Sequence, residues 1–235
     1  MMFSVIIPAY NEEGRLGPAL EKIRSFMDSK GYSCEVIVVT DGSTDRTPEI
    51  AQNSALSLSG RMKTLRNRQN RGKGYAVKRG VRIASGGLIL VSDADLSTPI
   101  EEVEKLMALI EDGADIAIGS RASSSSDILV KQPLYRQLMG KTFNLMIRGI
   151  VGRNFRDTQC GFKLFRKEAA KDIFTRTCVR GFAFDVEVIF LALRMGYEVR
   201  DTGVKWINSR ESKVHPLFSS LQMIRDIIRI KFIHR

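Results

Sequence analysis

Two aspartates, in the triplet Asp93-Ala94-Asp95, directly follow the apolar run 88–91 and the single residue Ser92. Residues i and i+2 of a strand point to the same side, so both carboxylates could reach one cation at the exit of a buried strand. Carboxylate oxygens suit Mg²⁺ or Mn²⁺. A second interpretation remains open, in which the two acids lie in a solvated loop and Thr98-Pro99 begins a helix. The triplet alone does not decide between the two.

Two further predicted strands end in polar residues of the same kind. The run 3–7 is followed by Tyr10 and Glu12, and the run 35–39 is followed by Asp41. Three apolar strands that each end near a carboxylate are typical of an open parallel sheet, which binds its ligand outside the carboxyl ends of the strands.

The elements between these strands indicate an α/β protein. Stretches with helical periodicity alternate with the strands, at residues 16–27, 74–84 and 100–110. A chain of 235 residues with 43% hydrophobic content can form one sizeable core and leaves little for a second domain. We therefore expect one domain over residues 1–215, followed by a helix at 216–235.

The charge of the chain predicts anionic partners. Lys and Arg number 37 against 26 Asp and Glu, a formal net charge of +11. The stretch 61–82 holds nine basic residues and no acid, and the stretch 128–167 holds nine more with Asp157 as its single acid. Both lack the interleaved aromatics of a nucleic-acid stacking platform, so we do not expect nucleic acid. Phosphates of small ligands and lipid headgroups explain the charge equally well.

The segment Arg71-Gly72-Lys73-Gly74 is the candidate phosphate loop. It is no Walker A motif, because Asn67 stands where the first glycine belongs and Gly74 replaces the Ser or Thr. No G-x-G-x-x-G follows the first strand, which disfavours a nicotinamide or flavin site. The glycines still permit close backbone approach at a helix start, which suits a phosphate, and a plain turn is the alternative.

Cysteine usage and hydropathy bear on location. Cys34, Cys160 and Cys178 are odd in number, far apart and in no C-x-x-C spacing, so they suggest neither a disulfide framework nor a zinc site. We find no signal-peptide pattern and no apolar run of about 18 residues, the length needed to cross a bilayer. We expect a cytoplasmic protein that meets a membrane from one side.

The segment 216–235 predicts an amphipathic helix. The residues expected on its apolar face are Leu217, Leu221, Ile224 and Ile228. Its basic residues are Arg225, Arg229, Lys231 and Arg235. Basic amphipathic helices suit membrane interfaces, so we expect peripheral attachment to the cytoplasmic face of a membrane. A terminal helix that packs on the core is the alternative.

Six motifs, taken together, resemble those of family 2 glycosyltransferases. They lie at residues 4–12, 41–45, 70–74, 93–95, 119–121 and 157–163. The likeness is nearest to the polyprenyl-phosphate glycosyltransferases, and among them to the dolichyl-phosphate β-glucosyltransferases, through residues 157–165, residues 184–187, and Trp206 with residues 212–214. It implies the GT-A fold, an open, mixed but mainly parallel sheet flanked by helices, here with a C-terminal amphipathic helix.

The resemblance implies a donor site for a nucleotide sugar. The residues it assigns to the donor are Pro8, Tyr10, Glu12, Asp41, Gly72, Lys73, Asp93 and Ala94. Asp93 and Asp95 would hold Mg²⁺ or Mn²⁺, which offsets charge on the leaving diphosphate. Simpler roles remain open for three of them: Tyr10 could pack at a strand end, Glu12 could cap a helix and Asp41 could be a turn acid.

The implied acceptor is a polyprenyl phosphate, which is ionised at neutral pH and is itself the nucleophile. No general base is then required, and the cations expected to place this phosphate are Arg121, Arg136 and Lys213. Asp157 and Glu187 could orient groups, or activate a hydroxyl acceptor as in other family branches, or simply be ion-paired. The assigned catalytic residues are Asp95, Arg121 and Asp157.

The reaction predicted from the resemblance is inverting transfer of a hexose, with UDP-glucose favoured as donor and GDP-mannose second. Two other classes remain as alternatives. A sugar nucleotidyltransferase would also use a metal carboxylate in an α/β sheet, although the amino-terminal glycine-rich loop expected of it is missing. A basic nucleic-acid-binding module would show a steep salt dependence and no metal requirement.

Overall fold

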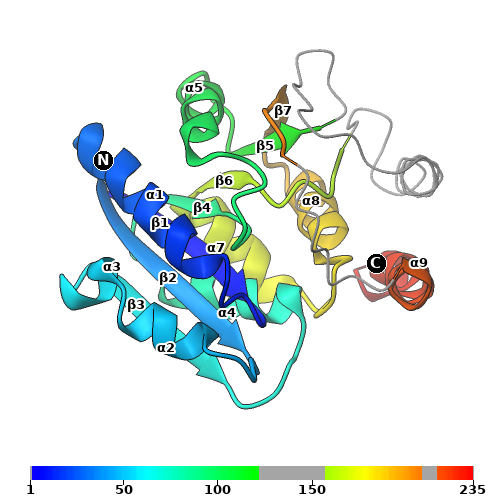
Figure 1. The fold of residues 1–235 in the computed structure, drawn as a ribbon. Coiled ribbons are helices and arrows are strands. Elements are labelled where there is room, and N and C mark those ends of the chain that lie inside the picture. The colour runs from blue at the N-terminus through cyan, green and yellow to red at the C-terminus, as the bar shows by residue number, and fades with distance from the viewer. Residues whose placement is uncertain (1, 122–156, 208–215, 235) are drawn as a thin grey trace.

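The computed structural model describes residues 2–121, 157–207 and 216–234, the side chains of 216–222 and 224 excepted. Strands and helices alternate along most of this part of the chain (Figure 1). The strands are β1 (Met2–Ala9), β2 (Ser33–Asp41), β3 (Met62–Asn67), β4 (Leu88–Val91), β5 (Ile116–Ser120), β6 (Lys163–Arg166) and β7 (Val199–Gly203). The helices are α1 (Leu16–Ser29), α2 (Thr47–Gln52), α3 (Ala55–Leu58), α4 (Lys73–Ile83), η1 (Ile100–Glu102), α5 (Val103–Glu111), α7 (Lys167–Arg176), α8 (Phe184–Arg194) and α9 (Pro216–Ile233).

The seven strands form one sheet in the order β3-β2-β1-β4-β6-β5-β7. All neighbouring pairs are parallel except those of β6, which runs antiparallel to both β4 and β5. This confirms the expected α/β class with a mixed, mainly parallel sheet. In the parallel register Ala9 lies opposite Thr40, and Ile6 lies opposite Val91. The carboxyl ends of β1, β2 and β4 therefore meet at one edge of the sheet.

Helices cover both faces of the sheet (Figure 1). The side chains of β1 alternate between the two faces. Val5 and Ile7 join the core that packs against α1, α2, α3 and α5, whereas Ile6 joins the core against α4, α7, α8 and α9. A parallel strand buried on both faces reads as a continuous apolar run, which explains the composition of residues 3–7.

The expected helices are present, with differences at their starts. The helix expected at 100–110 begins as the 3₁₀ turn η1, and no side chain caps it. Thr98 is buried, and its hydroxyl lies 3.9 Å from the Cys160 sulfur. The interpretation of Thr98-Pro99 as helix cap is therefore wrong for Thr98, because its hydroxyl is turned toward another segment.

Glu35, at the start of β2, ties three segments together. Its carboxylate accepts hydrogen bonds from Ser4 Oγ at 2.6 Å and from the Ser85 backbone N–H at 2.6 Å, and it forms an ion pair with Lys63 at 2.7 Å. Burial alone would raise the Glu35 pKa, but these partners lower it to about 2. Glu35 stays ionised inside the fold and fixes the turn that leads into β4.

Helix α9 forms where the sequence predicted a helix, but its described side chains face differently. Ile227 and Ile230 are buried in the core beside α8, whereas Ile228 is 51% exposed. Ile228, which was expected on the apolar face, is therefore not on the side of α9 that packs on the protein. Leu217, Leu221 and Ile224 lie outside the described side chains. In the part of the chain that the structure describes, no helix is long and apolar enough to span a membrane.

Candidate functional site

The loops after β1 and β2 are joined by hydrogen bonds at the carboxyl edge of the sheet. Asn11, with a left-handed φ of 54°, accepts a bond from the Thr44 N–H at 2.8 Å on its side-chain oxygen. The Glu12 N–H donates to Thr47 Oγ1 at 2.7 Å. These bonds fix the loop that follows β1 and carries the predicted donor residue Glu12. Two other predicted donor residues lie just before it: Pro8 is half-buried, and Tyr10 is 40% exposed.

Asp41 is buried and organises the candidate phosphate loop. Its carboxylate accepts hydrogen bonds from the Asn67 side-chain amide at 2.6 Å and from the backbone N–H groups of Arg71 and Gly72 at 3.0 and 2.7 Å. It is 3% exposed. The carboxylate thus fixes the segment that leads into α4, a role that the turn-acid interpretation came closest to. A direct contact of Asp41 with a nucleoside stays a prediction.

Lys73 begins α4 and points its ammonium group at the triplet. Its Nζ lies 2.5 Å from Asp93 Oδ1. Gly72, just before it, has a φ of 99°, and a Cβ there would lie 2.4 Å from the Arg180 carbonyl oxygen, so only glycine fits. Burial would lower the Lys73 pKa, but the negative charges of Asp93 and Asp185 raise it above its ordinary value. Lys73 is therefore a fixed cation at a helix start.

The triplet lies in a turn two residues after β4, not in the strand itself. Ala94 is buried, while the side chains of Asp93 and Asp95 are 38% and 20% exposed. Asp95 accepts a hydrogen bond from the Ser97 N–H at 2.9 Å, and Arg15 Nη1 lies 3.7 Å from its other oxygen. The alternation rule for strands therefore does not apply, and the turn is what orients the two carboxylates.

Gly161 allows a second segment to approach Asp93 closely. A Cβ at position 161 would lie 2.1 Å from Asp93 Oδ2. Burial would raise the Asp93 pKa, but the ammonium of Lys73 and the more distant charges of Lys163 and Arg121 lower it. Asp93 is thus an ionised carboxylate that remains partly exposed. Together with Asp95 it offers the hard oxygen ligands that Mg²⁺ or Mn²⁺ prefers.

The first prediction concerns this close approach. We expect Gly161→Ala to lower catalytic turnover by at least about tenfold, because the added methyl group must displace the Asp93 carboxylate, and a shift of about 1 Å in a site can cost about a hundredfold. Gly14→Ala is the matched control, since a Cβ at Gly14 would meet nothing within 4 Å. Steady-state kinetics on both variants, with thermal unfolding to verify the fold, would test this. If Gly161→Ala were as active as the parent, turnover would not depend on the position of the Asp93 carboxylate.

Arg121 and Asp157 form a bidentate ion pair at the end of β5. Arg121 Nε and Nη2 lie 2.6 and 2.9 Å from the two Asp157 oxygens, and the Arg121 N–H donates to the same carboxylate at 3.0 Å. The Arg121 guanidinium also lies 5.7 Å from the ring centroid of Trp206. Burial would raise the Asp157 pKa, but Arg121 lowers it to about 2. The pair uses Nε and Nη2 and leaves Nη1 outside it.

A buried ion pair, which sequence reasoning missed, lies beneath these groups. Lys163, on β6, contacts Asp185, on α8, and both side chains are almost fully buried. Lys163 also donates to the Cys160 carbonyl oxygen at 2.5 Å. The signal in the sequence was a lysine directly before the apolar pair Leu164-Phe165, since lysine is seldom buried without a partner.

The structure therefore brings together residues from six segments of the chain. Each cation of this group lies beside a carboxylate, and its members are Arg15, Lys73, Asp93, Asp95, Arg121, Asp157, Lys163 and Asp185. Arg15 is a further omission of the sequence reasoning. It binds Glu12 through two hydrogen bonds of 2.6 and 2.7 Å, so it links a predicted donor residue to Asp95. Arg136 and Lys213 lie outside the described residues.

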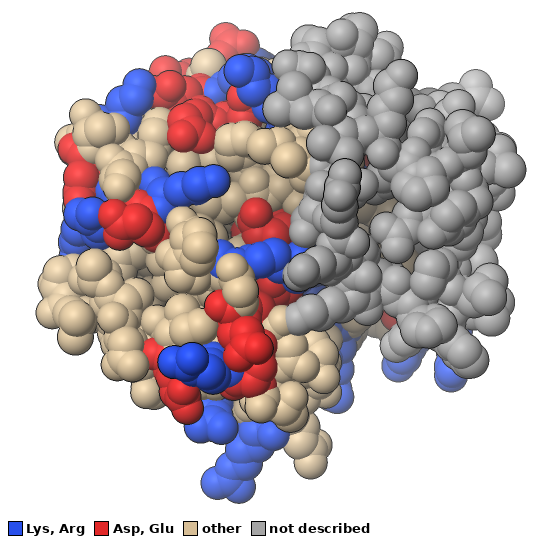
Figure 2. Space-filling view, in the orientation of Figure 1, with Lys and Arg blue, Asp and Glu red and all other residues tan. Residues whose placement is uncertain are grey.

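The arrangement suits a ligand that carries phosphates and a divalent cation. Figure 2 shows acidic and basic side chains close to one another across the described part of one face, rather than a continuous basic patch. Nucleic acid would favour the latter. Paired cations and carboxylates can instead bind a metal and a diphosphate at the same place.

Comparison with known proteins defines the class. Residues 4–174 match the family model described as "Glycosyl transferase family 2". The chain therefore belongs to glycosyl transferase family 2. This confirms the expected resemblance to that family.

Individual relatives indicate a narrower group within the family. The chain is 37% identical over 240 residues to the dolichyl-phosphate beta-glucosyltransferase of Dictyostelium discoideum, which covers 97% of this chain and 73% of that protein. The protein of the same name from Homo sapiens is 34% identical over 97% of this chain and 74% of its own. That of Saccharomyces cerevisiae is 32% identical over 98% and 74%.

Solved structures confirm the fold. Glucosyl-3-phosphoglycerate synthase from Mycobacterium tuberculosis, in complex with Mn²⁺, uridine diphosphate and phosphoglyceric acid, has a TM-score of 0.71 at 16% identity, covering 98% of this chain and 77% of that one. Mannosyl-3-phosphoglycerate synthase from Rubrobacter xylanophilus has a TM-score of 0.70 at 16% identity, covering 99% and 73%. At this identity the likeness concerns the fold, which is the expected GT-A arrangement.

Proposed function

We propose that the protein transfers glucose from UDP-glucose to a polyprenyl phosphate of the dolichyl type. The relatives named dolichyl-phosphate beta-glucosyltransferase support this choice of sugar and acceptor, since they match nearly the whole chain. The structural observation that carries the proposal is the ion pair of Asp93 with Lys73, whose Nζ lies 2.5 Å from Asp93 Oδ1. A cation expected to bind the donor phosphates thus lies beside a carboxylate expected to bind the metal.

On the donor side, Asp93 and Asp95 would hold a divalent cation. A neighbour of the same fold binds Mn²⁺ with uridine diphosphate, which supports Mn²⁺, with Mg²⁺ as the alternative. The ion, when bound, offsets the charge that develops on the β-phosphate as the sugar leaves. Lys73 adds a fixed positive charge at the amino-terminal end of α4, where the backbone N–H groups also favour a phosphate.

On the acceptor side, an ionised phosphate is the nucleophile and needs no general base. The described carboxylates considered for that role are already engaged: Asp157 by Arg121, Asp185 by Lys163, and Glu187 by two backbone N–H groups and His234. Arg121 would hold the phosphate on the face of the sugar opposite to the leaving diphosphate. Attack from that face inverts the anomeric carbon, so the product is the opposite anomer.

The function is tested by offering the purified protein radiolabelled UDP-glucose or GDP-mannose with a short polyprenyl phosphate, followed by solvent extraction. We expect label in the lipid phase from UDP-glucose. Label from GDP-mannose alone would assign a mannosyltransferase instead. Release of pyrophosphate from a sugar phosphate and a nucleoside triphosphate would assign a nucleotidyltransferase and overturn the proposal.

We propose further that α9 attaches the protein to the cytoplasmic face of a membrane, where a lipid acceptor would be found. Ile228 and Phe232, one helical turn apart, are 51% and 61% exposed. Arg225, Arg229 and Lys231 are exposed on the same helix. Apolar groups flanked by cations suit an anionic lipid surface. The buried face of α9, by contrast, packs on α8.

The second prediction tests this surface. We expect Phe232→Glu to reduce flotation with anionic liposomes and to slow transfer to a long-chain acceptor, because a charge replaces a side chain that would enter the interface. A short, water-soluble acceptor should be used at the normal rate. Leu58→Glu is the matched control, since Leu58 is 79% exposed but lies on α3. Equal flotation of both variants and the parent would place the attachment elsewhere.

A further inference from the structure

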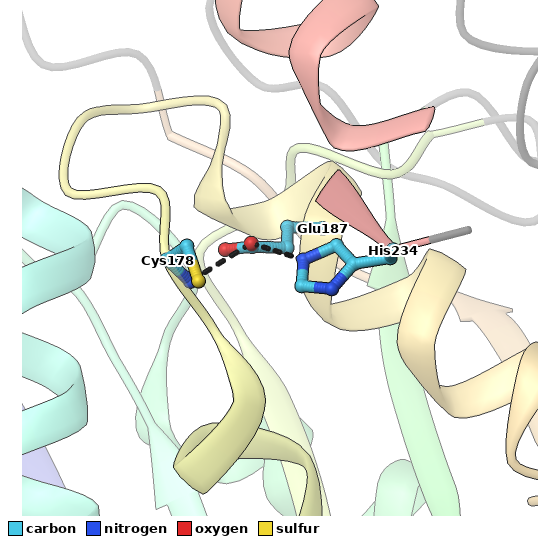
Figure 3. Close-up of side chains that lie close together, drawn as sticks. All are labelled: Cys178, Glu187 and His234. Carbon is cyan, nitrogen blue, oxygen red and sulfur yellow. Dashed lines mark hydrogen bonds and ion pairs between the residues drawn. The ribbon is translucent and has the colours of Figure 1, made fainter. Parts of the chain in front are cut away.

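A cluster of three different metal-ligating side chains lies outside the group described above. It consists of Cys178, in the loop after α7, Glu187 on α8 and His234 at the end of α9 (Figure 3). One ligand atom of each lies within 4.8 Å of those of the other two. Glu187 is fully buried, His234 is largely buried and Cys178 is exposed. A thiol, a carboxylate and an imidazole therefore lie close together near the surface, with the carboxylate fully buried beneath the thiol.

The carboxylate in the middle of the cluster is held from one side by the backbone. The N–H groups of Cys178 and Val179 donate to the two oxygens of Glu187, each at 2.8 Å. These bonds fix the carboxylate plane and also fix the loop that carries the Cys178 sulfur. Ligands that are oriented by such bonds bind a metal with less loss of side-chain entropy.

The histidine is held from the other side by α8. His234 Nε2 lies 2.7 Å from Glu187 Oε1, and its ring centroid lies 6.4 Å from that of Phe190. Arg194 donates to the His234 carbonyl oxygen. Glu187, Phe190 and Arg194 lie on one face of α8, so the helix receives the end of α9 through three successive contacts.

We propose that Cys178, Glu187 and His234 bind a thiophilic divalent cation, with Zn²⁺ as the natural occupant. Thiolate, imidazole and carboxylate are the three ligand types that Zn²⁺ uses in proteins, and three protein ligands leave a fourth position for water. Binding requires the Cys178 thiolate and an unprotonated Nε2 on His234, so the thiol proton is released and a neutral imidazole carries its own proton on Nδ1 instead. The site differs in chemistry from Asp93 and Asp95, whose oxygens suit the harder Mg²⁺ or Mn²⁺.

The position of the cluster suggests what occupancy would do. The loop that carries Cys178 also supports the start of α4, because the Tyr75 N–H donates to the Arg180 carbonyl oxygen at 3.2 Å. A Cβ on Gly74 would lie 2.6 Å from the Val179 carbonyl oxygen, so the two segments are in close contact. A cation bound by Cys178 and His234 would fasten this loop to α9 and so steady the backbone beneath Lys73.

The test uses the full chain and Co²⁺, which replaces Zn²⁺ and gives a sulfur-to-cobalt charge-transfer band when a thiolate is a ligand. We expect one Co²⁺ per chain, a charge-transfer band, and loss of that band on adding Zn²⁺. Cys178→Ser should abolish the band. His234→Asn should weaken Zn²⁺ affinity by more than about tenfold, since even outer partners of metal ligands contribute about ten- to a hundredfold. Cys34→Ser and His215→Asn are the matched controls and should bind as the parent does.

The same titrations can be followed by thermal unfolding, because a ligand that binds only the folded state raises the midpoint. Zn²⁺ should raise the midpoint of the parent and of both controls, but not that of Cys178→Ser or His234→Asn. Absence of a band in the parent, or an equal band in Cys178→Ser, would overturn the proposal. Neither measurement uses the glycosyl transfer assay, so the metal-site proposal is tested independently of the proposed function.

Discussion

The Asp95→Asn variant should transfer sugar at least about a hundredfold more slowly than the parent while it keeps the fold. The loss of one group that stabilises developing charge typically costs about a hundred- to a thousandfold in turnover. Among the described residues, Asp95 accepts a hydrogen bond from the Ser97 N–H and lies 3.7 Å from Arg15 Nη1, so the change to an amide should disturb little else. Measurement of turnover at saturating UDP-glucose and polyprenyl phosphate, with and without EDTA, would check this.

Asp112→Asn is a matched control for Asp95→Asn. The Asp112 side chain is 78% exposed and pairs with Arg200 at the far end of α5, so its loss should leave turnover unchanged. EDTA should inactivate the parent, and Mn²⁺ or Mg²⁺ should restore it. Full activity of Asp95→Asn, or of the parent in EDTA, would remove the metal from the mechanism.

The sheet could be predicted from the sequence because its central strands β1 and β4 are almost wholly apolar. Residues 3–7 and 88–91 carry side chains that are buried on both faces, and each run ends where the polar edge begins. The antiparallel strand β6 was not predicted, since it is four residues long and Lys163 and Arg166 stand at its two ends. Its place between β4 and β5 depends on contacts between distant segments, which local periodicity does not contain.

The residues of the candidate site could be predicted from the motifs. The ion pairs between these residues could not. The positions of Lys73, Asp93 and Arg121 at strand and helix ends followed from the sequence. The partners that fix them did not, because Asp157 pairs with Arg121 across 36 residues and Lys163 pairs with Asp185 across 22. Charge pairing over such separations is decided by the order of the strands in the sheet.

The basic composition takes on a different meaning in the structure. The nine basic residues between 61 and 82 suggested one anionic partner, yet several of them are committed to the protein itself. Lys63 pairs with Glu35, Arg61 pairs with Asp28, and Lys78 donates to the Thr177 carbonyl oxygen. Lys73 alone of these four faces the predicted metal carboxylates. Net charge therefore indicated the class of ligand, and the fold determines which cation serves it.

Arg121 gives the last prediction, which concerns use of the acceptor. Arg121→Lys should lower kcat/KM for the polyprenyl phosphate by about ten- to a hundredfold and leave the KM for UDP-glucose nearly unchanged. An ammonium keeps the charge, and it cannot hold Asp157 through two parallel bonds while a further nitrogen reaches a phosphate. The matching polyprenol without phosphate should be inert with the parent. Initial rates at varied acceptor and at varied donor would separate the two effects.

The conservative change is preferred to Arg121→Ala because Asp157 is 4% exposed and would be left as an unpaired buried charge, at a cost of about 3–5 kcal/mol in folding stability. The double variant Arg121→Ala with Asp157→Asn removes both charges and restores balance. It should fold, bind UDP-glucose and fail with the lipid phosphate, because the cation that places the nucleophile is gone. If the double variant used the acceptor normally, or if the parent glucosylated the free polyprenol efficiently, Arg121 would not be the phosphate-binding residue, and a carboxylate base would have to be sought in its place.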